Sequence, residues 1–236
     1  MDDIERLVQR CVSVLPLGSA ELGGEYGYDC LPLCVIDAVW SIGVRYGGVK
    51  NVVARYSAHY ALEHDENRHE HSVAELTLAM EEKGVAWFAE EVFRNAQRTS
   101  TRGGILKAEA VYRFAAILKR HGMYTIQDIP KIDWYENLRN EIQRPYAQEI
   151  LSIPGQRSGI SLSYFYMLTG SSGLVKPDRM VYGFLRETLN RQVSDADAQH
   201  LLSYASQRLN SDFPELTPRL LDHQIWKYQS GRISSS

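Results

Sequence analysis

The stretch over residues 149–163 constrains the fold of this chain most, because it reads as two helices joined by a tight turn. Pro154 cannot continue a helix and biases the residue before it toward an extended conformation. Gly155 supplies backbone angles that other residues adopt only at a cost. The second helix is predicted over 160–168, with Ser158 placed to cap it. Its first amide groups point into the turn, so the turn is suited to bind an anion such as a nucleic-acid phosphate.

The remainder of the chain also carries helical patterns. Apolar residues recur at helical spacing, and we find no convincing alternation of apolar and polar residues and no internal repeat. The other segments expected to be helical are 3–15, 33–44, 49–60, 106–118, 134–142, 181–189, 195–209 and 218–228. The sequence therefore predicts an all-α fold.

The composition limits the cellular compartments and the classes of partner that we expect. The 236 residues are 44% hydrophobic and carry a net charge of −3. Because the chain is acidic overall, binding to a nucleic acid would require a local basic surface. Three cysteines, at positions 11, 30 and 34, predict no disulfide framework and fit a reducing compartment. The N-terminus lacks an apolar leader, and the longest apolar run is too short to span a bilayer. We expect an intracellular protein, in the cytoplasm and nucleoid or in the nucleus, with no membrane partner.

Charge is distributed unevenly along the chain. Residues 63–91 hold nine Asp or Glu, whereas residues 94–120 hold seven Arg or Lys against one Glu. Because phosphates repel carboxylates, we expect the acidic segment to point away from nucleic acid. The basic segment is a candidate phosphate-binding surface, with Arg98, Arg102 and Lys107 as its contacts. A merely solvated charged face is the alternative.

The histidines of the acidic segment come closest to a metal-binding pattern. His69 and His71 flank Glu70, but His-x-His is not a helical ligand spacing, and there is no zincin pattern. The chain also lacks a nucleophile elbow and a dinucleotide fingerprint. We predict neither a metal site nor a cofactor.

Three segments lie in an order that points to a known family. Lys-Ala-Glu-Ala-Val at 107–111 precedes Ile-Pro-Gly at 153–155, and Pro-Asp-Arg-Met follows at 177–180. They resemble the helix before the hairpin, the hairpin itself and the catalytic segment of the helix-hairpin-helix base-excision DNA glycosylase superfamily, of the endonuclease III and alkyladenine type. A weaker match lies at 39–51. The resemblance covers about residues 30–190.

The resemblance implies a two-lobed helical fold with a cleft between the lobes. The central lobe would span 28–172 and contain the helix-hairpin-helix, and residues 1–27 would pack with 173–236 as the second lobe. The resemblance makes Asp178, in the cleft, the catalytic residue. The residues expected to contact the DNA backbone are Gly155, Gln156, Arg157, Ser158, Gly159 and Lys176.

Two departures from the family pattern bear on the activity. Arg157 stands where the family has its second hairpin glycine, and Gly159 stands where lyase-competent members have a lysine. Without that amine there is no obvious Schiff-base nucleophile. No cysteine follows Cys34, so the iron–sulfur cluster of some relatives cannot form. The resemblance implies a monofunctional glycosylase, acting as a monomer on a DNA duplex with a modified base.

Two other readings stay open for the function of the chain. The altered hairpin keeps open a DNA-binding protein that has lost catalysis. The acidic face over 63–91 keeps open a helical adaptor that binds other proteins.

Asp178 has a structural interpretation beside the catalytic one. An Asp after Pro177 and directly before a helix is an N-cap, which stabilises the helix by about 1 kcal/mol. The two interpretations are compatible, because a capping carboxylate is held rigidly. Near the anomeric carbon, it would stabilise the sugar cation of N-glycosidic hydrolysis and orient the attacking water.

The remaining candidates concern the flipped base. By their position relative to the family, Arg45 or Tyr46 would wedge into the duplex where the base leaves. Trp40 and Trp134 would add stacking surface to the base pocket. The alternatives are a surface corner that pairs with Asp37 and, for the aromatic residues, ordinary core packing.

Overall fold

The computed structural model describes residues 2–22, 27–44 and 46–234, with side chains for all of these except 46 and 232–234. The described residues form helices and contain no β-strand, which confirms the predicted all-α fold. An isolated antiparallel bridge joins Arg98 to Leu106. Within the described ranges, no helix combines the length and the apolar character that crossing a membrane requires.

The chain divides into two compact units. Unit 1 consists of Met1–Tyr26, Lys131–Arg139 and Ser171–Ser236, and unit 2 consists of Gly27–Pro130 and Asn140–Gly170. The sequence-based limits differ mainly at 131–139, which we expected in the central lobe. The cleft between the lobes stays a prediction.

Residues 131–139 belong to unit 1 because their backbone pairs with the segment that follows residue 170. The backbone N–H of Ile132 donates to Ser171 Oγ at 2.9 Å, and the N–H of Gly173 donates to the carbonyl of Ile132 at 2.9 Å. The approach is close, since a Cβ on Gly173 would lie 2.2 Å from the backbone carbon of Asp133. Helical periodicity does not reveal such a long-range pairing.

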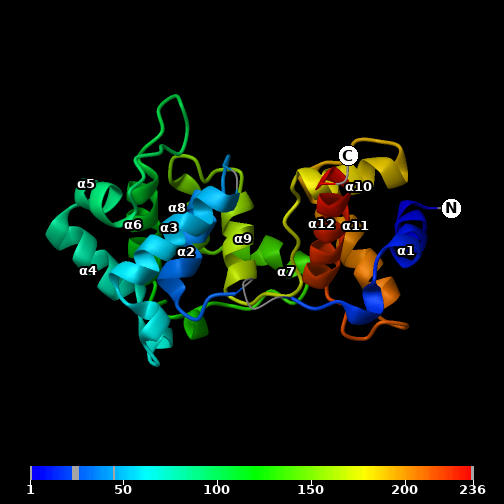
Figure 1. Cartoon of the computed structure of the whole chain (residues 1–236), viewed down its shortest axis with the longest axis horizontal. Helices are drawn as coiled ribbons and strands as arrows, with labels where there is room; N and C mark the ends of the chain where they lie inside the picture. Colours follow the sequence, from blue (N-terminus) through cyan, green and yellow to red (C-terminus); the bar gives the residue numbers. More distant parts are fainter. Residues whose placement is uncertain (1, 23–26, 45, 235–236) are drawn as a thin grey trace. The chain divides into compact units, whose positions relative to one another are not determined.

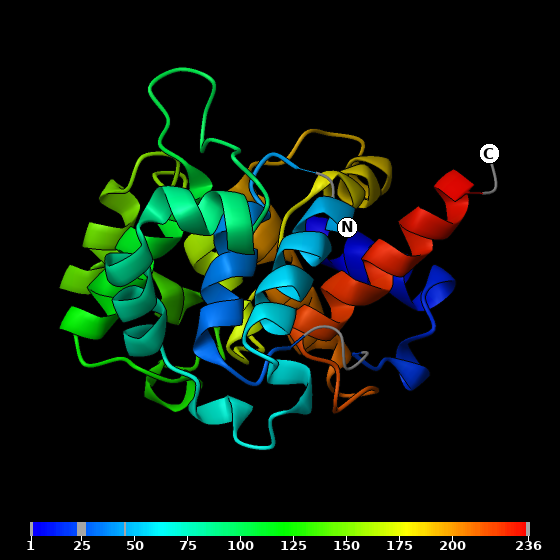
Figure 2. The ribbon, with the colours of Figure 1, turned by 60° about the vertical axis from the view of Figure 1, so that its left-hand side comes forward.

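Unit 2 is built around helix α2, whose ten residues are all buried (Figures 1 and 2). Helix α2 packs against α3, α6 and α9, while α4 and α8 pack against α6. The helices of three or more residues in this unit are α2 (Leu31–Trp40), α3 (Tyr46–His59), α4 (Val73–Lys83), α5 (Val85–Trp87), the π-helix η5 (Phe88–Val92), α6 (Lys107–Arg120), α8 (Pro145–Ser152), α9 (Ile160–Leu168) and the 3₁₀ turns η3 (Leu62–His64), η4 (Arg68–Glu70) and η6 (Ile126–Asp128).

The buried carboxylate of α2 is hydrogen-bonded to two hydroxyl groups. Asp37 accepts hydrogen bonds from Tyr28 Oη at 2.7 Å and from Ser41 Oγ at 2.6 Å. Arg55 on α3 donates to the backbone carbonyls of Phe93 and Arg94. Two hydroxyl donors thus pair with this buried carboxylate.

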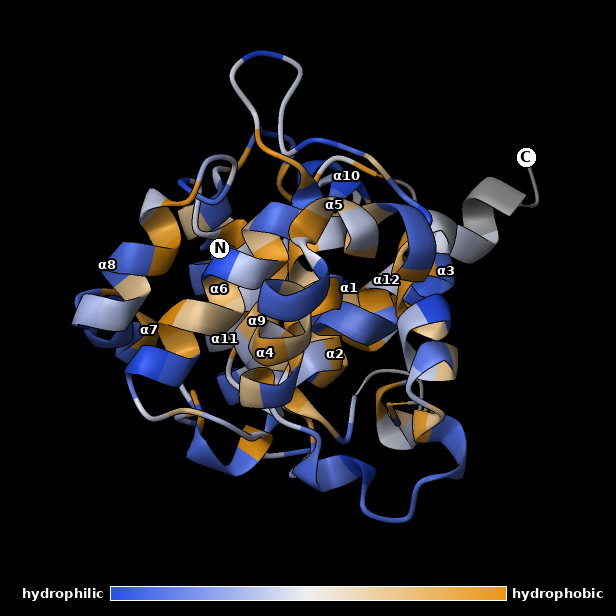
Figure 3. Cartoon of the chain, turned by 90° about the vertical axis from the view of Figure 1, so that its left-hand side faces the viewer, coloured by the Kyte–Doolittle hydropathy of each residue, from blue (hydrophilic) through white to orange (hydrophobic). Residues whose placement is uncertain are grey.

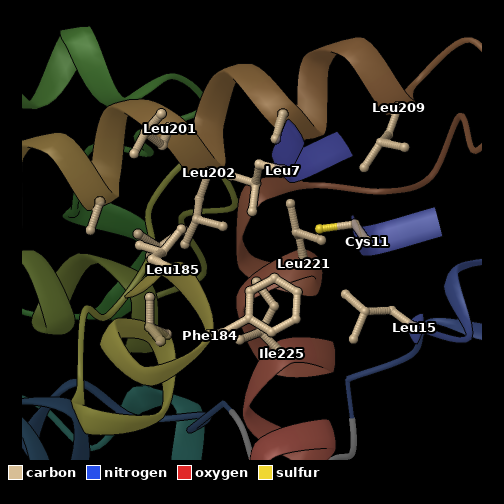
Figure 4. Packing of buried hydrophobic residues seen from close by; sticks show 14 of the residues in the cluster. Leu7, Cys11, Leu15, Phe184, Leu185, Leu201, Leu202, Leu209, Leu221 and Ile225 are labelled. Carbon is tan, nitrogen blue, oxygen red and sulfur yellow. The ribbon is translucent and has the colours of Figure 1, made fainter. Parts of the chain in front are cut away.

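Unit 1 surrounds an apolar core that joins both ends of the chain (Figure 4). Helix α1 (Asp3–Val14) packs against α10 (Arg179–Leu189) and α11 (Asp195–Leu209), and α12 (Pro218–Ser234) packs against the same two helices. Leu7, Phe184, Leu202 and Leu221 meet there and are fully buried. Each such side chain contributes about 1.5–3 kcal/mol through burial. The turn η1 (Leu17–Ser19) and most of α7 (Tyr135–Ile142) also belong to this unit.

Candidate functional site

The turn between α8 and α9 has the glycine-dependent geometry that the sequence predicts. Gly155 and Gly159 adopt φ of +91° and +75°, in the left-handed region that favours glycine. Gly159, rather than the predicted Ser158, is the N-cap residue of α9, and Ser158 Oγ accepts the N–H of Ile160 at 3.4 Å. The amides of the first turn of α9 have no acceptor within the helix.

A loop from a distant part of the sequence contacts this turn. Gly155 approaches Thr99 so closely that a Cβ on the glycine would lie 2.4 Å from Thr99 Cβ. Thr99 begins the loop over 99–104, which precedes α6 and extends away from the helices (Figures 1 and 2). The N–H of Thr99 donates to Ile105 O at 2.9 Å, which closes the loop at its base. The two segments predicted to contact phosphate therefore lie side by side in unit 2.

This turn–loop surface, formed by residues 99–104 and 153–159, is polar, and the tip of the loop is hydrophilic in Figure 3. Arg102 and Arg157 are exposed and form no ion pair within the described parts of the chain. Arg98 is also exposed, but its guanidinium donates to the carbonyl of Gly104 and so helps to close the loop. Arg102 and Arg157 are thus the cations best placed to contact an anion here.

The basic segment over 94–120 offers fewer open charges than its composition suggests. Arg113 pairs with Glu109, and Lys119 Nζ donates to Thr77 Oγ1. Arg120 pairs with Glu149. The many cations of this segment therefore do not form an equally large basic surface that is open to an anion.

Lys107 does not occupy the phosphate-contacting position predicted for it. Its side chain is buried, and Nζ donates to the carbonyls of Trp40 and Ile42 at 3.0 and 2.8 Å. It therefore caps the C-terminus of α2, where the helix dipole favours a cation. Burial lowers the pKa of this amine to about 8.

Two further predicted contacts lie in the core of unit 2. The Gln156 side chain is buried and accepts a hydrogen bond from Ser161 Oγ, so it supports the turn from inside instead of facing DNA. Trp40 is fully buried and packs on Phe93 at 4.7 Å between ring centroids. It has no exposed ring face for a flipped base, so its prediction as a pocket residue is wrong for this structure.

The structure does not test the two predicted wedge residues. Arg45 lies outside the described residues. Tyr46 is the first residue of α3, but its side chain is not among those described. Their role stays a prediction.

Trp134 lies in unit 1 in a partly exposed aromatic group. Its ring meets Tyr204 edge-on at 5.3 Å, and Tyr204 in turn lies 4.4 Å from the ring of His200. Glu136 accepts hydrogen bonds from both Trp134 Nε1 and Tyr204 Oη. The ring of Trp134 is thus partly exposed, unlike the ring of Trp40.

Asp178 is the N-cap of α10, which confirms the structural part of its prediction. Its Oδ1 accepts the backbone N–H groups of Met180 and Val181 at 2.8 and 3.1 Å. The residue is partly exposed, as is Lys176 two positions earlier. The carboxylate is therefore held by two backbone N–H groups on a partly exposed residue.

A second carboxyl group near Asp178 escaped the sequence analysis. Asp222 on α12 hydrogen-bonds to the backbone N–H of Lys176. Burial, aided by the charge of Asp178, raises the pKa of Asp222 to about 8. The available signal was an Asp between Leu221 and Ile225 on the apolar side of the last helix, and no motif singles it out.

The acidic segment lines a hollow in unit 2 together with Tyr28, Asp29 and Gln127. Arg68 in this hollow pairs with Asp29. Across the described residues, no three His, Cys, Asp or Glu side chains gather as metal ligands do.

Comparison with known proteins gives one match. A family model described as Domain of unknown function (DUF8548) matches residues 5–230, nearly the whole chain. No curated protein and no solved structure matches this chain.

Proposed function

We propose that this chain, which belongs to the family described as Domain of unknown function (DUF8548), is a monofunctional DNA glycosylase. The observation that carries the proposal is the contact between Gly155 and Thr99, because it joins the two predicted phosphate-binding segments into one surface. That surface offers the guanidinium groups of Arg102 and Arg157 beside the N-terminus of α9. Guanidinium groups and helix N-termini are the usual phosphate ligands of proteins.

Asp178 supplies the reason to propose hydrolysis as well as binding. In the proposed reaction the bond from the anomeric carbon to the base breaks, and its electron pair leaves with the base. A water oxygen bonds to the anomeric carbon, and a proton of that water passes to the Asp178 carboxylate. A carboxylate fixed by two backbone N–H groups needs no reorganisation to stabilise the developing sugar cation.

Two positions matched to the family favour a monofunctional enzyme. Gly159, at the position of the family's lyase lysine, carries no amine and holds φ of +75°. Lys107 has its amine enclosed by two backbone carbonyls in unit 2. In this proposal, water is the nucleophile, and the protein works inside the cell as a monomer on duplex DNA.

A second candidate is a DNA-binding protein without catalysis. It is favoured by the fact that the turn–loop surface is complete within unit 2, whereas Asp178 lies in unit 1 and already has a structural role as an N-cap. Such a protein would hold duplex DNA through Arg102 and Arg157 and release no base.

A panel of duplexes, each with one modified base, tests the proposal. We expect the wild-type protein to release the base from at least one duplex and to leave strands that break only after alkali. Breakage before alkali contradicts the monofunctional assignment. Duplex binding without release across the panel favours the DNA-binding candidate.

A further inference from the structure

Asp222 lies where α12 packs against α10, in the first half of α12. Its neighbours Leu221 and Ile225 are fully buried in the apolar core of unit 1. The residue is partly exposed as a whole, yet its Oδ1 atom is buried and has no hydrogen-bond partner within the described residues. A carboxyl oxygen in this position needs an explanation, because buried polar atoms are nearly always paired.

The hydrogen bond to Lys176 connects this carboxyl group to the candidate catalytic segment. The backbone N–H of Lys176 donates to Asp222 two residues before Asp178. Asp178 then caps α10 through Met180 and Val181. The segment over 176–178 is thus held at one end by α12 and at the other end by α10.

The unpaired oxygen favours an uncharged Asp222. An ionised carboxylate spreads its charge over both oxygens, and burying one of them without a donor is costly. Three charged groups act on Asp222: Asp178 at the start of α10, Lys176 before it, and Arg219 on α12 itself. Asp178 reinforces burial in favouring the protonated form, and the two cations oppose it.

We propose that Asp222 is a positioning residue for Asp178 and that the two side chains form a pair in which Asp222 is uncharged. Asp222 keeps its proton and anchors the N–H of Lys176, two residues before Asp178. This inference rests on the proposed function for its catalytic meaning, but the pairing itself is a property of unit 1.

The pairing predicts how turnover depends on pH. As the solution becomes alkaline, Asp222 ionises, and a second negative charge develops behind Asp178. Like charges repel, so the anchored segment over 176–178 is destabilised when Asp222 ionises. We therefore expect base release to fall in the range where Asp222 loses its proton.

A titration of the aspartate carboxyl carbons by ¹³C NMR tests the pairing without any substrate. In the full-length wild-type protein, we expect Asp222 to titrate near pH 8 and therefore well above the ordinary range of Asp. In Asp178→Asn, the Asp222 midpoint should move down, because the amide removes the neighbouring charge. An Asp222 midpoint near 4, or one that Asp178→Asn leaves in place, overturns the proposal.

The catalytic part is tested by pH profiles of base release. Asp222→Asn cannot ionise but keeps an acceptor for the Lys176 N–H, so it should lose the alkaline fall and retain more turnover at pH 7 than Asp222→Leu. The control Asp212→Asn changes an exposed Asp after α11 and should keep the wild-type profile. An alkaline fall that persists in Asp222→Asn refutes the positioning role. If the wild type releases no base at all, the proposed function fails while the titration still decides the pairing.

Discussion

At the residue scale, several polar side chains of unit 2 turn inward to satisfy backbone groups. Lys107 ends α2 by donating to two carbonyls, and Gln156 supports the turn before α9 through Ser161. Exposed Arg102 and Arg157 remain as the cations of the turn–loop surface. The division between structural and DNA-facing residues therefore follows burial and not charge.

Lys107→Met should destabilise the protein by about 2–4 kcal/mol. The variant keeps the apolar stem but leaves the carbonyls of Trp40 and Ile42 without the donors they have now. Chemical denaturation measures the change in the free energy of unfolding. The exposed Arg102→Gln serves as control and should change stability by less than about 0.5 kcal/mol. Equal stability of the two variants contradicts the capping role of Lys107.

Arg102→Gln and Arg157→Gln should weaken duplex binding and reduce its salt dependence. Each removed phosphate contact lowers the slope of log affinity against log salt by about 1. Fluorescence anisotropy with one duplex over a salt series measures that slope. Arg113→Gln is the matched control, because Arg113 pairs with Glu109 on α6. If all three variants give the wild-type slope, DNA does not meet the turn–loop surface.

At the element scale, the contact between the α8–α9 turn and the 99–104 loop holds the candidate surface together. The helix predicted over 160–168 agrees with α9, because Pro154 and Gly155 end the helix before it and an apolar run follows the turn. Helix α3 begins earlier than predicted, at Tyr46, because Gly47 and Gly48 lie inside its first turn instead of before it. Local pattern identifies the helices, whereas their partners depend on contacts far apart in the sequence.

Gly155→Ala should destabilise the turn and separate it from the loop. Its φ of +91° is strained for alanine, and the new Cβ would meet Thr99 at 2.4 Å. We expect a loss of at least about 1 kcal/mol in stability together with weaker duplex binding. Gly48→Ala, in α3 with open space around it, is the control and should be neutral or stabilising. Wild-type stability of Gly155→Ala contradicts the close contact.

At the scale of the whole molecule, the sequence predicts a helical protein with N- and C-terminal segments associated, and the structure assigns both segments to unit 1. The turn and the cap by Asp178 follow from local rules for Pro, Gly and Asp. The core position of Trp40 matches the alternative that its apolar helix offered, whereas the buried position of Lys107 and the role of Asp222 could not be predicted, because they arise only when distant helices pack. The pairing of 131–139 with the segment after residue 170 is missed for the same reason.

The free energy of unfolding should depend on pH in a way that reflects the protonation of Asp222. Its pKa is raised in the folded state, so between about pH 4 and pH 8 the native protein binds a proton that the unfolded chain has released. Its contribution to stability is therefore complete below about pH 4 and is lost as the pH rises toward 8. Urea denaturation at pH 5 and pH 8 should show that Asp222→Asn gains stability relative to the wild type at pH 8. An equal difference at both pH values contradicts this assignment.

The central claim, that Asp178 performs hydrolysis beyond its structural role, is tested most directly by single-turnover base release in Asp178→Asn. Asn caps helices about as well as Asp, so the variant should fold and bind the duplex like the wild type. Asp2→Asn, which changes the Asp that caps α1 in the same unit, is the matched control. We predict that Asp178→Asn loses base release by at least about 10²-fold while Asp2→Asn retains it. Base release by Asp178→Asn at the wild-type rate would contradict the assignment and leave Asp178 as a helix cap alone.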